Sequence, residues 1–169
     1  MHLKPGFNYC IANKMTTAGI ITTDADGQHL SEDIVNLHDK FSTDPHALWI
    51  GSRTFSKSST PWRSRFGNQL TAFLFTKLFH TPIGDTQSGL RAIPWNLIPK
   101  LVMLKTNGFE FELEMLIVAV KNQISIKTMP VQTIYIEKNK SSSFNPIVDS
   151  IKIYRVFLHY IIKRAIKSF

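Results

Sequence analysis

The chain has 169 residues, 43% of them hydrophobic and 19% charged, which is an ordinary globular composition and long enough for one domain with a hydrophobic core. Its formal net charge of +8 at pH 7 favours anionic partners: phosphorylated metabolites, nucleic acid or an anionic membrane surface. The single cysteine, Cys10, excludes an intramolecular disulfide and a zinc site built from cysteines. Neither a signal peptide nor an apolar run long enough to cross a bilayer is visible, so we expect a cytoplasmic protein.

A buried strand is predicted near the start of the chain, after a short helix within residues 5–18. The apolar, β-branched run from Ile20 to Thr23 leads directly into Asp24 and Asp26. Ligands of open α/β sheets bind at the carboxyl ends of the strands, and two residues one apart point to the same side of an extended chain. Hard divalent cations prefer carboxylate oxygens. The stretch therefore predicts a site for a metal ion and a diphosphate.

A helix and a second strand are predicted to follow the acidic pair. Ser31 is the expected N-cap of a helix that runs to Phe41, and the apolar run at 47–51 is typical of a buried strand. Arg53 comes at the end of this strand. The residues at 54–61 are rich in Ser, Thr and Lys, and we expect them to form a loop over the same sheet edge.

A polar turn is predicted at residues 81–94, after an amphipathic helix over residues 66–80. Gly84 and Gly89 in this turn permit unusual backbone angles. Polar groups so dense in a turn indicate a site, although a turn-capping role for the aspartate is an equally good interpretation. The polar residues of the turn are Asp85, Gln87, Ser88 and Arg91.

Four arginines are positioned in the sequence to meet the acidic pair at one sheet edge. Three lie just beyond the second strand, and the fourth follows the polar turn. The alternative is that they are solvated surface residues. A diphosphate leaving group or a phosphate acceptor must be neutralised and oriented, which a metal ion and several guanidinium groups can do. The predicted set is Arg53, Arg63, Arg65 and Arg91.

The last third of the chain is predicted to contain two helices, at 94–104 and 109–120, then one or two strands within 124–136. Pro130 marks an edge or a break in this strand region. A long helix at 146–169 carries a basic stripe on an otherwise apolar cylinder. This helix either docks on the domain or lies in the plane of a membrane, with a slight preference for the membrane. The basic residues are Lys152, Arg155, His159, Lys163 and Lys167.

Other site classes fit the sequence less well. A calcium-binding EF-hand loop would place Thr22 at the first ligand position and Asp33 at the last, and the preceding segment is predicted to be a strand. A simple turn with solvated carboxylates is the stronger alternative for the acidic pair. The twelve phenylalanines fall mostly at helix-face positions, which favours a core over base-stacking platforms and weakens the nucleic-acid interpretation.

The chain resembles family 2 glycosyltransferases of the subgroup that includes dolichol-phosphate mannosyltransferases and bacterial undecaprenyl-phosphate glycosyltransferases. The resemblance implies a partial GT-A fold: a Rossmann-like α/β domain that binds a nucleotide sugar, with a mixed sheet flanked by helices and a C-terminal amphipathic helix. The stretches that carry it follow the family's order and cover nearly the whole chain: ITTDADGQHLSEDI, WIGSR, PWRSRFGNQ, DTQSGLRA, FEFELEML and SSSFNPIVDSIKIYR.

The resemblance also implies a function, namely metal-dependent, inverting transfer of a sugar from a nucleotide-diphosphate donor to a polyprenyl-phosphate acceptor. Asp24 and Asp26, with Gln28, would hold Mg²⁺ or Mn²⁺ against the donor diphosphate. Asp85 would sit at the reacting centre as a base or a positioning group, and residues 138–143 would close over the donor. The predicted contacts to donor or acceptor phosphate are Arg53, Arg63, Arg65, Arg91, Ser88 and Lys140.

The chain departs from this family in two ways. Many bacterial relatives have SSHF where this chain has Ser142, Ser143 and Phe144. The chain also begins after the family's first strand and helix, so we expect residues 1–145 to be a truncated GT-A domain and residues 146–169 a basic amphipathic helix. A complementing N-terminal fragment or a homo-oligomer is an expected partner, together with a peripheral position at the cytoplasmic face of a membrane. The alternative function is an inactive remnant that acts as a binding module.

Overall fold

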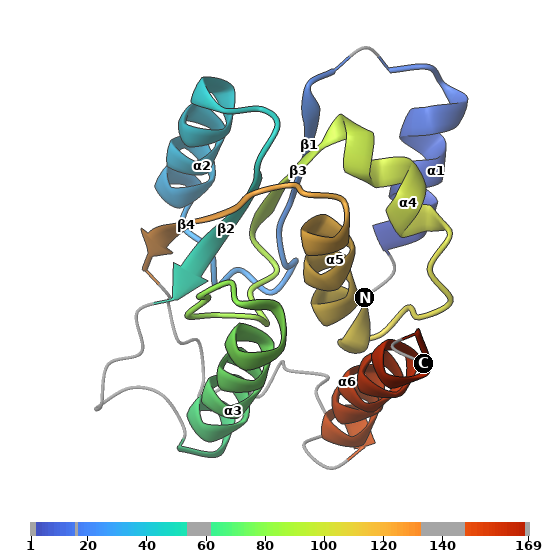
Figure 1. Cartoon of the computed structure of the whole chain (residues 1–169). Coiled ribbons are helices and arrows are strands. Elements are labelled where there is room, and N and C mark those ends of the chain that lie inside the picture. Colours follow the sequence, from blue (N-terminus) through green and yellow to red (C-terminus); the bar gives the residue numbers. More distant parts are fainter. Residues whose placement is uncertain (1–2, 16, 54–61, 133–147, 168–169) are drawn as a thin grey trace.

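The computed structural model describes residues 3–15, 17–53, 62–132 and 148–167, with the side chains of residues 62–66, 149 and 164–167 outside the description. A mixed sheet organises these residues (Figure 1). Its strands are β1 (Gly19–Thr22), β2 (Leu48–Arg53), β3 (Arg91–Pro94) and β4 (Ile126–Val131), in the order β1-β3-β2-β4. β2 and β4 pair in parallel, whereas β3 runs antiparallel to β1 and β2. β1, β2 and β4 therefore point the same way, and their carboxyl ends meet at one edge.

Helices cover both faces of the sheet. Along β2, Leu48 and Ile50 belong to one core cluster and Trp49 packs against another, because successive side chains of a strand point to opposite faces. The cluster at Trp49 is closed by α2, and the larger cluster is shared by α1, α3, α4, α5 and α6. The helices are α1 (Leu3–Ala12), α2 (Ser31–Thr43), α3 (Trp62–Phe79), α4 (Ile98–Val102), α5 (Glu110–Lys121) and α6 (Val148–Lys167), with a 3₁₀ turn, η1 (Trp95–Leu97), before α4.

The α/β class predicted from the sequence is confirmed, and the mixed sheet with its flanking helices is consistent with a partial GT-A-type domain. The strand predicted at 20–23 is β1, but it is an edge strand of the described sheet, and only Thr22 in it is buried. The strand predicted at 47–51 is β2, which continues to Arg53. Pro130 lies in β4, an edge strand of the described sheet, where its missing N–H removes no ladder bond that the sheet needs.

Two predictions about local structure are wrong. Residues 91–94 are not part of a turn: they form β3, which lies between β1 and β2 and is buried at all four positions. Such a short strand is stabilised by its two neighbours rather than by its own residues, so it carries little local signal. Ser31 is not the N-cap of α2. Leu30 takes that position, without a side-chain hydrogen bond, and Ser31 begins the helix.

The predicted helix at 94–104 is shorter than expected, because it is divided into η1 and α4 and ends at Val102. The predicted C-terminal helix is α6, which packs against α5 and α3: the ring of Tyr160 lies 4.5 Å from that of Phe79, and Lys121 Nζ lies 4.7 Å from the centre of the Tyr160 ring. Among the described helices, none is both long and apolar enough to span a membrane.

Candidate active site at the carboxyl edge of the sheet

The sheet topology brings three of the predicted site segments to one edge. Asp24 is the second residue after β1, Arg53 ends β2, and the segment 85–90 leads into β3, which starts at the edge where its antiparallel neighbours end. The edge can be followed in Figure 1 at the arrowhead of β2. Side chains far apart in the sequence are therefore neighbours here, as the sequence predicted for a ligand-binding edge.

Asp24 lies in a close-fitting space between His29 and Gly89. His29 Nε2 is 3.6 Å from Asp24 Oδ2, with the His29 side chain only 5% exposed and that of Asp24 36% exposed. A Cβ at position 89 would lie 2.4 Å from both carboxylate oxygens, so only glycine leaves room for them. The hydroxyl of Thr22 donates to Gly89 O at 3.1 Å and ties the end of β1 to this glycine. The Asp24 carboxylate is thus confined from two sides.

The segment after Asp24 turns instead of continuing as extended chain, which corrects the geometry assumed for the acidic pair. Asp26 Oδ1 accepts the backbone N–H of Gln28 at 3.0 Å, and Gly27 has a φ of 76°, a left-handed angle that favours glycine. Asp24, Asp26 and Gln28 are nevertheless all less exposed than the residues between them. The alternation of less exposed and more exposed residues that the sequence predicted is therefore present, but a turn produces it instead of an extended strand.

The donor atoms near Asp24 suit a hard divalent cation. Among the described residues, no group of three His, Cys, Asp or Glu side chains could hold a metal by itself. The predicted set of Asp24, Asp26 and Gln28 offers two carboxylates and one amide oxygen, and Mg²⁺ or Mn²⁺ usually completes such a set with water and substrate phosphate. The glycine-lined space around the Asp24 carboxylate fits this chemistry, because a ligating oxygen must be held in place.

Asp85 is completely buried and forms a two-pronged ion pair with Arg53. Arg53 Nε donates to Asp85 Oδ2 at 2.7 Å and Nη2 donates to Oδ1 at 3.0 Å. The backbone N–H groups of Arg53 and Gln87 donate to the same carboxylate. Burial raises the pKa of Asp85, but these hydrogen bonds and the charge of Arg53 outweigh it and hold that pKa below its usual value. Asp85 therefore stays ionised and orients the guanidinium.

Arg91 lies inside the protein, where it links the 85–90 segment to α5. Its Nε donates to Ser88 O at 2.8 Å, its Nη2 to Thr86 O at 2.9 Å, and its Nη1 to Glu112 O at 2.8 Å. Only 1% of its side chain is exposed. This environment favours a structural role for Arg91 over the direct phosphate contact predicted from the sequence. Ser88 is equally buried, and its Oγ has no hydrogen-bond partner among the described residues.

Glu112 is a buried acid to which the sequence reasoning gave no role. Its carboxylate lies 3.6 Å from Arg91 Nη2, and its Oε2 has no hydrogen-bond partner among the described residues. Burial raises the pKa of Glu112 to about 7, against the opposing effect of the Arg91 charge. The stretch FEFELEML contains three glutamates, and the available signal was that Glu112 shares a helix face with the apolar residues Met115 and Leu116.

Asn68 of α3 was also missed, although it holds the polar segment in place. Its Oδ1 accepts hydrogen bonds from both the backbone N–H and the hydroxyl of Thr86, each at 3.1 Å. Asn68 is 1% exposed, and a buried amide is expected to be satisfied in this way. Neither Gly84 nor Gly89 has a positive φ, so the unusual backbone angles predicted for this segment are absent. Gly89 is important instead because its lack of a side chain leaves room for the Asp24 carboxylate.

Three predicted phosphate contacts have side chains outside the described residues. Arg63 and Arg65 lie in the first turns of α3, with side chains outside the described residues. Lys140 lies in a segment outside the description, as do the loops expected at 54–61 and 138–143.

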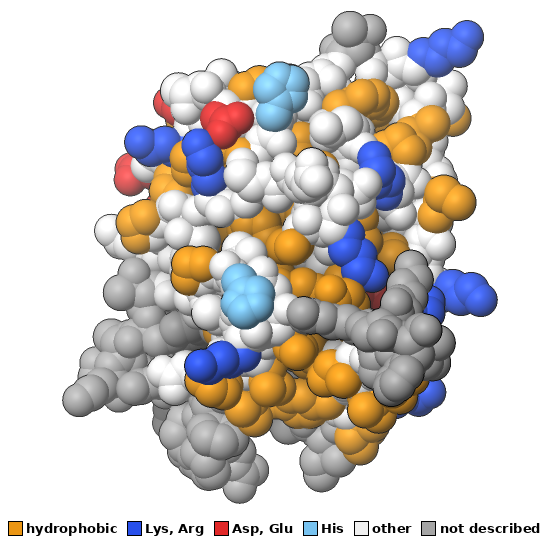
Figure 2. Space-filling view, in the orientation of Figure 1, with side chains coloured by type: hydrophobic (Ala, Val, Ile, Leu, Met, Phe, Trp, Pro, Cys, Tyr) orange, Lys and Arg blue, Asp and Glu red, His pale blue; other side chains and the backbone are white. Residues whose placement is uncertain are grey.

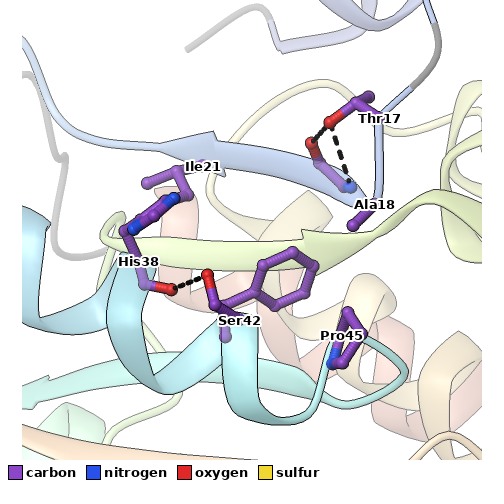
Figure 3. A pocket seen from close by; sticks show the side chains of 8 residues that line it. Thr17, Ala18, Ile21, His38, Ser42 and Pro45 are labelled. Carbon is purple, nitrogen blue, oxygen red and sulfur yellow. Dashed lines mark hydrogen bonds between the residues drawn. The ribbon is translucent and has the colours of Figure 1, made fainter.

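A surface pocket of about 360 Å³ lies away from these residues (Figure 3). It is formed by the start of β1 and the second half of α2, with His38 and Ile21 on one side and Pro45 on the other. None of the predicted site residues lines it. It lies toward the amino end of β1, whereas Asp24 follows the carboxyl end. The described pocket and the predicted site are therefore separate features.

No family model matches the chain. The chain is similar to curated archaeal proteins. One, from Methanococcus voltae, is named UDP-N-acetylglucosamine--dolichyl-phosphate N-acetylglucosaminyltransferase and is 30% identical over 142 residues, which cover 82% of this chain and 57% of that protein. Another, an uncharacterized protein of Methanocaldococcus jannaschii, is 33% identical over 132 residues, which cover 76% of this chain and 54% of that protein. The chain thus spans a little over half the length of these relatives.

Proposed function

We propose that this chain belongs to a family 2 glycosyltransferase that moves a sugar from a nucleotide-diphosphate donor to a polyprenyl-phosphate acceptor. The position of Asp24 and the Arg53–Asp85 pair at one sheet edge carries the proposal, because it combines a carboxylate suited to a divalent cation with an oriented guanidinium. The name of the Methanococcus voltae relative supports this substrate class, since it includes a nucleotide sugar and a dolichyl phosphate.

In this reaction an oxygen of the acceptor phosphate attacks the anomeric carbon of the sugar. The bond from that carbon to the donor diphosphate breaks, the nucleoside diphosphate leaves with the electron pair, and the configuration at the carbon is inverted. The acceptor phosphate is already anionic at neutral pH, so it needs no general base and its orientation dominates. Arg53 binds this phosphate, and Asp85 acts as a positioning residue that fixes the guanidinium in one direction.

A bound Mg²⁺ or Mn²⁺ would neutralise the charge that develops on the leaving diphosphate. Asp24, Asp26 and Gln28 are the residues that would hold it. The confined carboxylate of Asp24 costs little reorganisation when a cation arrives, which is the advantage of a preorganised ligand. Arg63, Arg65 and Lys140 remain proposed phosphate contacts.

The acceptor lipid requires access to a membrane, and α6 offers a suitable surface. One face of α6 packs on the core through Ile153 and Phe157. A second face exposes apolar side chains with Arg155 among them, and further basic side chains lie beside it. Figure 2 shows hydrophobic side chains gathered in the part of the view where α3 and α6 lie. The exposed apolar residues of α6 are Val148, Ile151, Leu158, Ile161 and Ile162, and the neighbouring basic ones include Lys152, Arg155 and Lys163.

We therefore propose a peripheral position at the membrane, with α6 in the headgroup region. The purified chain should sediment with vesicles that contain anionic lipid and much less with neutral ones. Leu158→Ser should weaken this binding, whereas Val35→Ser, at an equally exposed apolar position on α2, should leave it unchanged. Equal losses for both variants would contradict the assignment of α6.

Donor binding tests the catalytic part of the proposal. A panel of nucleotide-diphosphate sugars with Mn²⁺ should raise the melting temperature of the chain, and one of them should support sugar transfer to a polyprenyl phosphate. Asp24→Asn should abolish the metal-dependent rise, because it removes the charge that the cation needs. Asp39→Asn, at an exposed acid on α2, is the matched control. If no donor raises the melting temperature, the alternative of an inactive binding module replaces this proposal for the chain.

A further inference from the structure

His29 is buried beside Asp24, and one of its ring nitrogens has no hydrogen-bond partner among the described residues. Its side chain is 5% exposed, its Nε2 faces Asp24 Oδ2 at 3.6 Å, and its Nδ1 is buried with no hydrogen-bond partner among the described residues. A buried polar atom without a partner costs about 1–3 kcal/mol. This ring is held in an unfavourable environment, beside the carboxylate predicted to bind metal.

The His38–Asp39 pair on the surface of α2 provides an internal comparison. His38 Nδ1 lies 3.1 Å from Asp39 Oδ1, and the two side chains are 64% and 71% exposed. Water satisfies both groups there, so the contact needs no further explanation. The His29–Asp24 pair is longer, buried on the histidine side, and placed at the sheet edge where the other site residues meet.

We infer that His29 is a positioning residue for Asp24: its Nε2 lies 3.6 Å from Oδ2, just beyond hydrogen-bond distance, and its Nε2–H would donate to Oδ2 once a divalent cation is bound at Oδ1. This inference rests on the proposed metal site. The backbone at Gly89 limits the carboxylate on another side, so the imidazole and the glycine together fix its rotation. Ligating carboxylates are generally hydrogen-bonded in turn, and loss of such a partner weakens metal binding by about 10- to 100-fold.

Two amide substitutions distinguish the two ring nitrogens. The amide nitrogen of Gln can occupy the place of Nε2, whereas that of Asn is close to the place of Nδ1. Mn²⁺ binding, measured from the electron paramagnetic resonance signal of free Mn²⁺, should change by no more than about 3-fold in His29→Gln. It should weaken by about 10-fold or more in His29→Asn. His38→Gln, the exposed counterpart, should bind like the unaltered chain.

The other outcomes contradict the positioning role of His29, the assignment of Nε2 or the metal site itself. Unchanged binding by both His29→Gln and His29→Asn excludes the positioning role. Retention by His29→Asn with loss by His29→Gln would make Nδ1 the active nitrogen, and equal losses in both would exclude a donated hydrogen bond. If the unaltered chain binds no Mn²⁺, the proposed metal site itself is wrong and this role falls with it, which separates the two failures.

Nitrogen NMR of the unaltered chain keeps the inference testable if His29→Asn does not fold. In a sample labelled with ¹⁵N-histidine, the ring of His29 should carry its proton on Nε2, and the Nε2 resonance should move when Mg²⁺ is added. The resonances of His38 should stay in place. A proton on Nδ1, or an unmoved Nε2 resonance at Mg²⁺ saturation, would contradict the inference.

Discussion

Gly89→Ala should remove metal binding while leaving the fold intact. A Cβ at this position would lie 2.4 Å from both oxygens of Asp24 and 2.5 Å from its Cγ, whereas ordinary contact begins at 3.4 Å. The carboxylate must therefore retreat by about 1 Å, which is a displacement that can lower catalytic efficiency about 100-fold. Metal-binding groups tolerate a misplacement of only about 0.5 Å.

The stability of this variant should change little. The atoms that the new methyl group meets belong to the end of a side chain that is 36% exposed and can rotate away. Position 89 has no positive φ, so alanine fits its backbone and should stabilise the chain by about 0.4–1 kcal/mol through the unfolded state. Binding of Mn²⁺ and donor should therefore be lost at an unchanged or slightly raised melting temperature.

Gly84→Ala in the same segment is the matched control. The nearest atom to a Cβ there is Ser52 Oγ at 3.6 Å, an ordinary contact, so metal and donor binding should be retained. Mn²⁺ titration and thermal melting of the three proteins give the comparison. If Gly89→Ala binds Mn²⁺ as tightly as the unaltered chain, the position of the Asp24 carboxylate is not critical. If it melts far lower, the backbone rather than the carboxylate yields to the methyl group.

Two further predictions concern the buried charges. The pKa of Glu112 is raised to about 7 in the folded chain, so its stabilising contribution is present below its ordinary pKa of 4.5 and is lost as pH rises through 7. In urea unfolding, the free energy of unfolding of the unaltered chain should fall from about pH 5 to about pH 8, and that of Glu112→Gln should not. If the variant shows the same fall, a group other than Glu112 causes it. Arg53→Ala leaves the fully buried Asp85 carboxylate unpaired and should cost on the order of 3 kcal/mol in the same measurement. Asp85→Asn keeps a hydrogen-bond acceptor and leaves Arg53, which is 23% exposed, in reach of water, so this variant should lose less unfolding free energy than Arg53→Ala. A larger loss in Asp85→Asn would contradict the assignment of Asp85 as the more deeply buried partner.

Local sequence patterns determined much of this protein. The β-branched run before Asp24 and the apolar run before Arg53 predicted β1 and β2, and the periodicity of the later segments predicted α3, α5 and α6. These patterns are informative because a strand buried on both faces needs a continuous apolar run and a packed helix needs an apolar stripe. The acidic residues at the end of β1 and the arginine at the end of β2 followed from the same reasoning.

Only the tertiary structure decided how the polar residues are used. Whether Arg91 faces solvent or the core depends on β3, whose four residues become a strand because β1 and β2 lie on either side of them. Asp85 and Arg53, 32 positions apart, become partners because β2 ends beside the segment that leads into β3. The confinement of Asp24 likewise depends on Gly89, which no local pattern connects with it. Periodicity reports the environment of a residue along its own element, whereas a site is formed by contacts between elements.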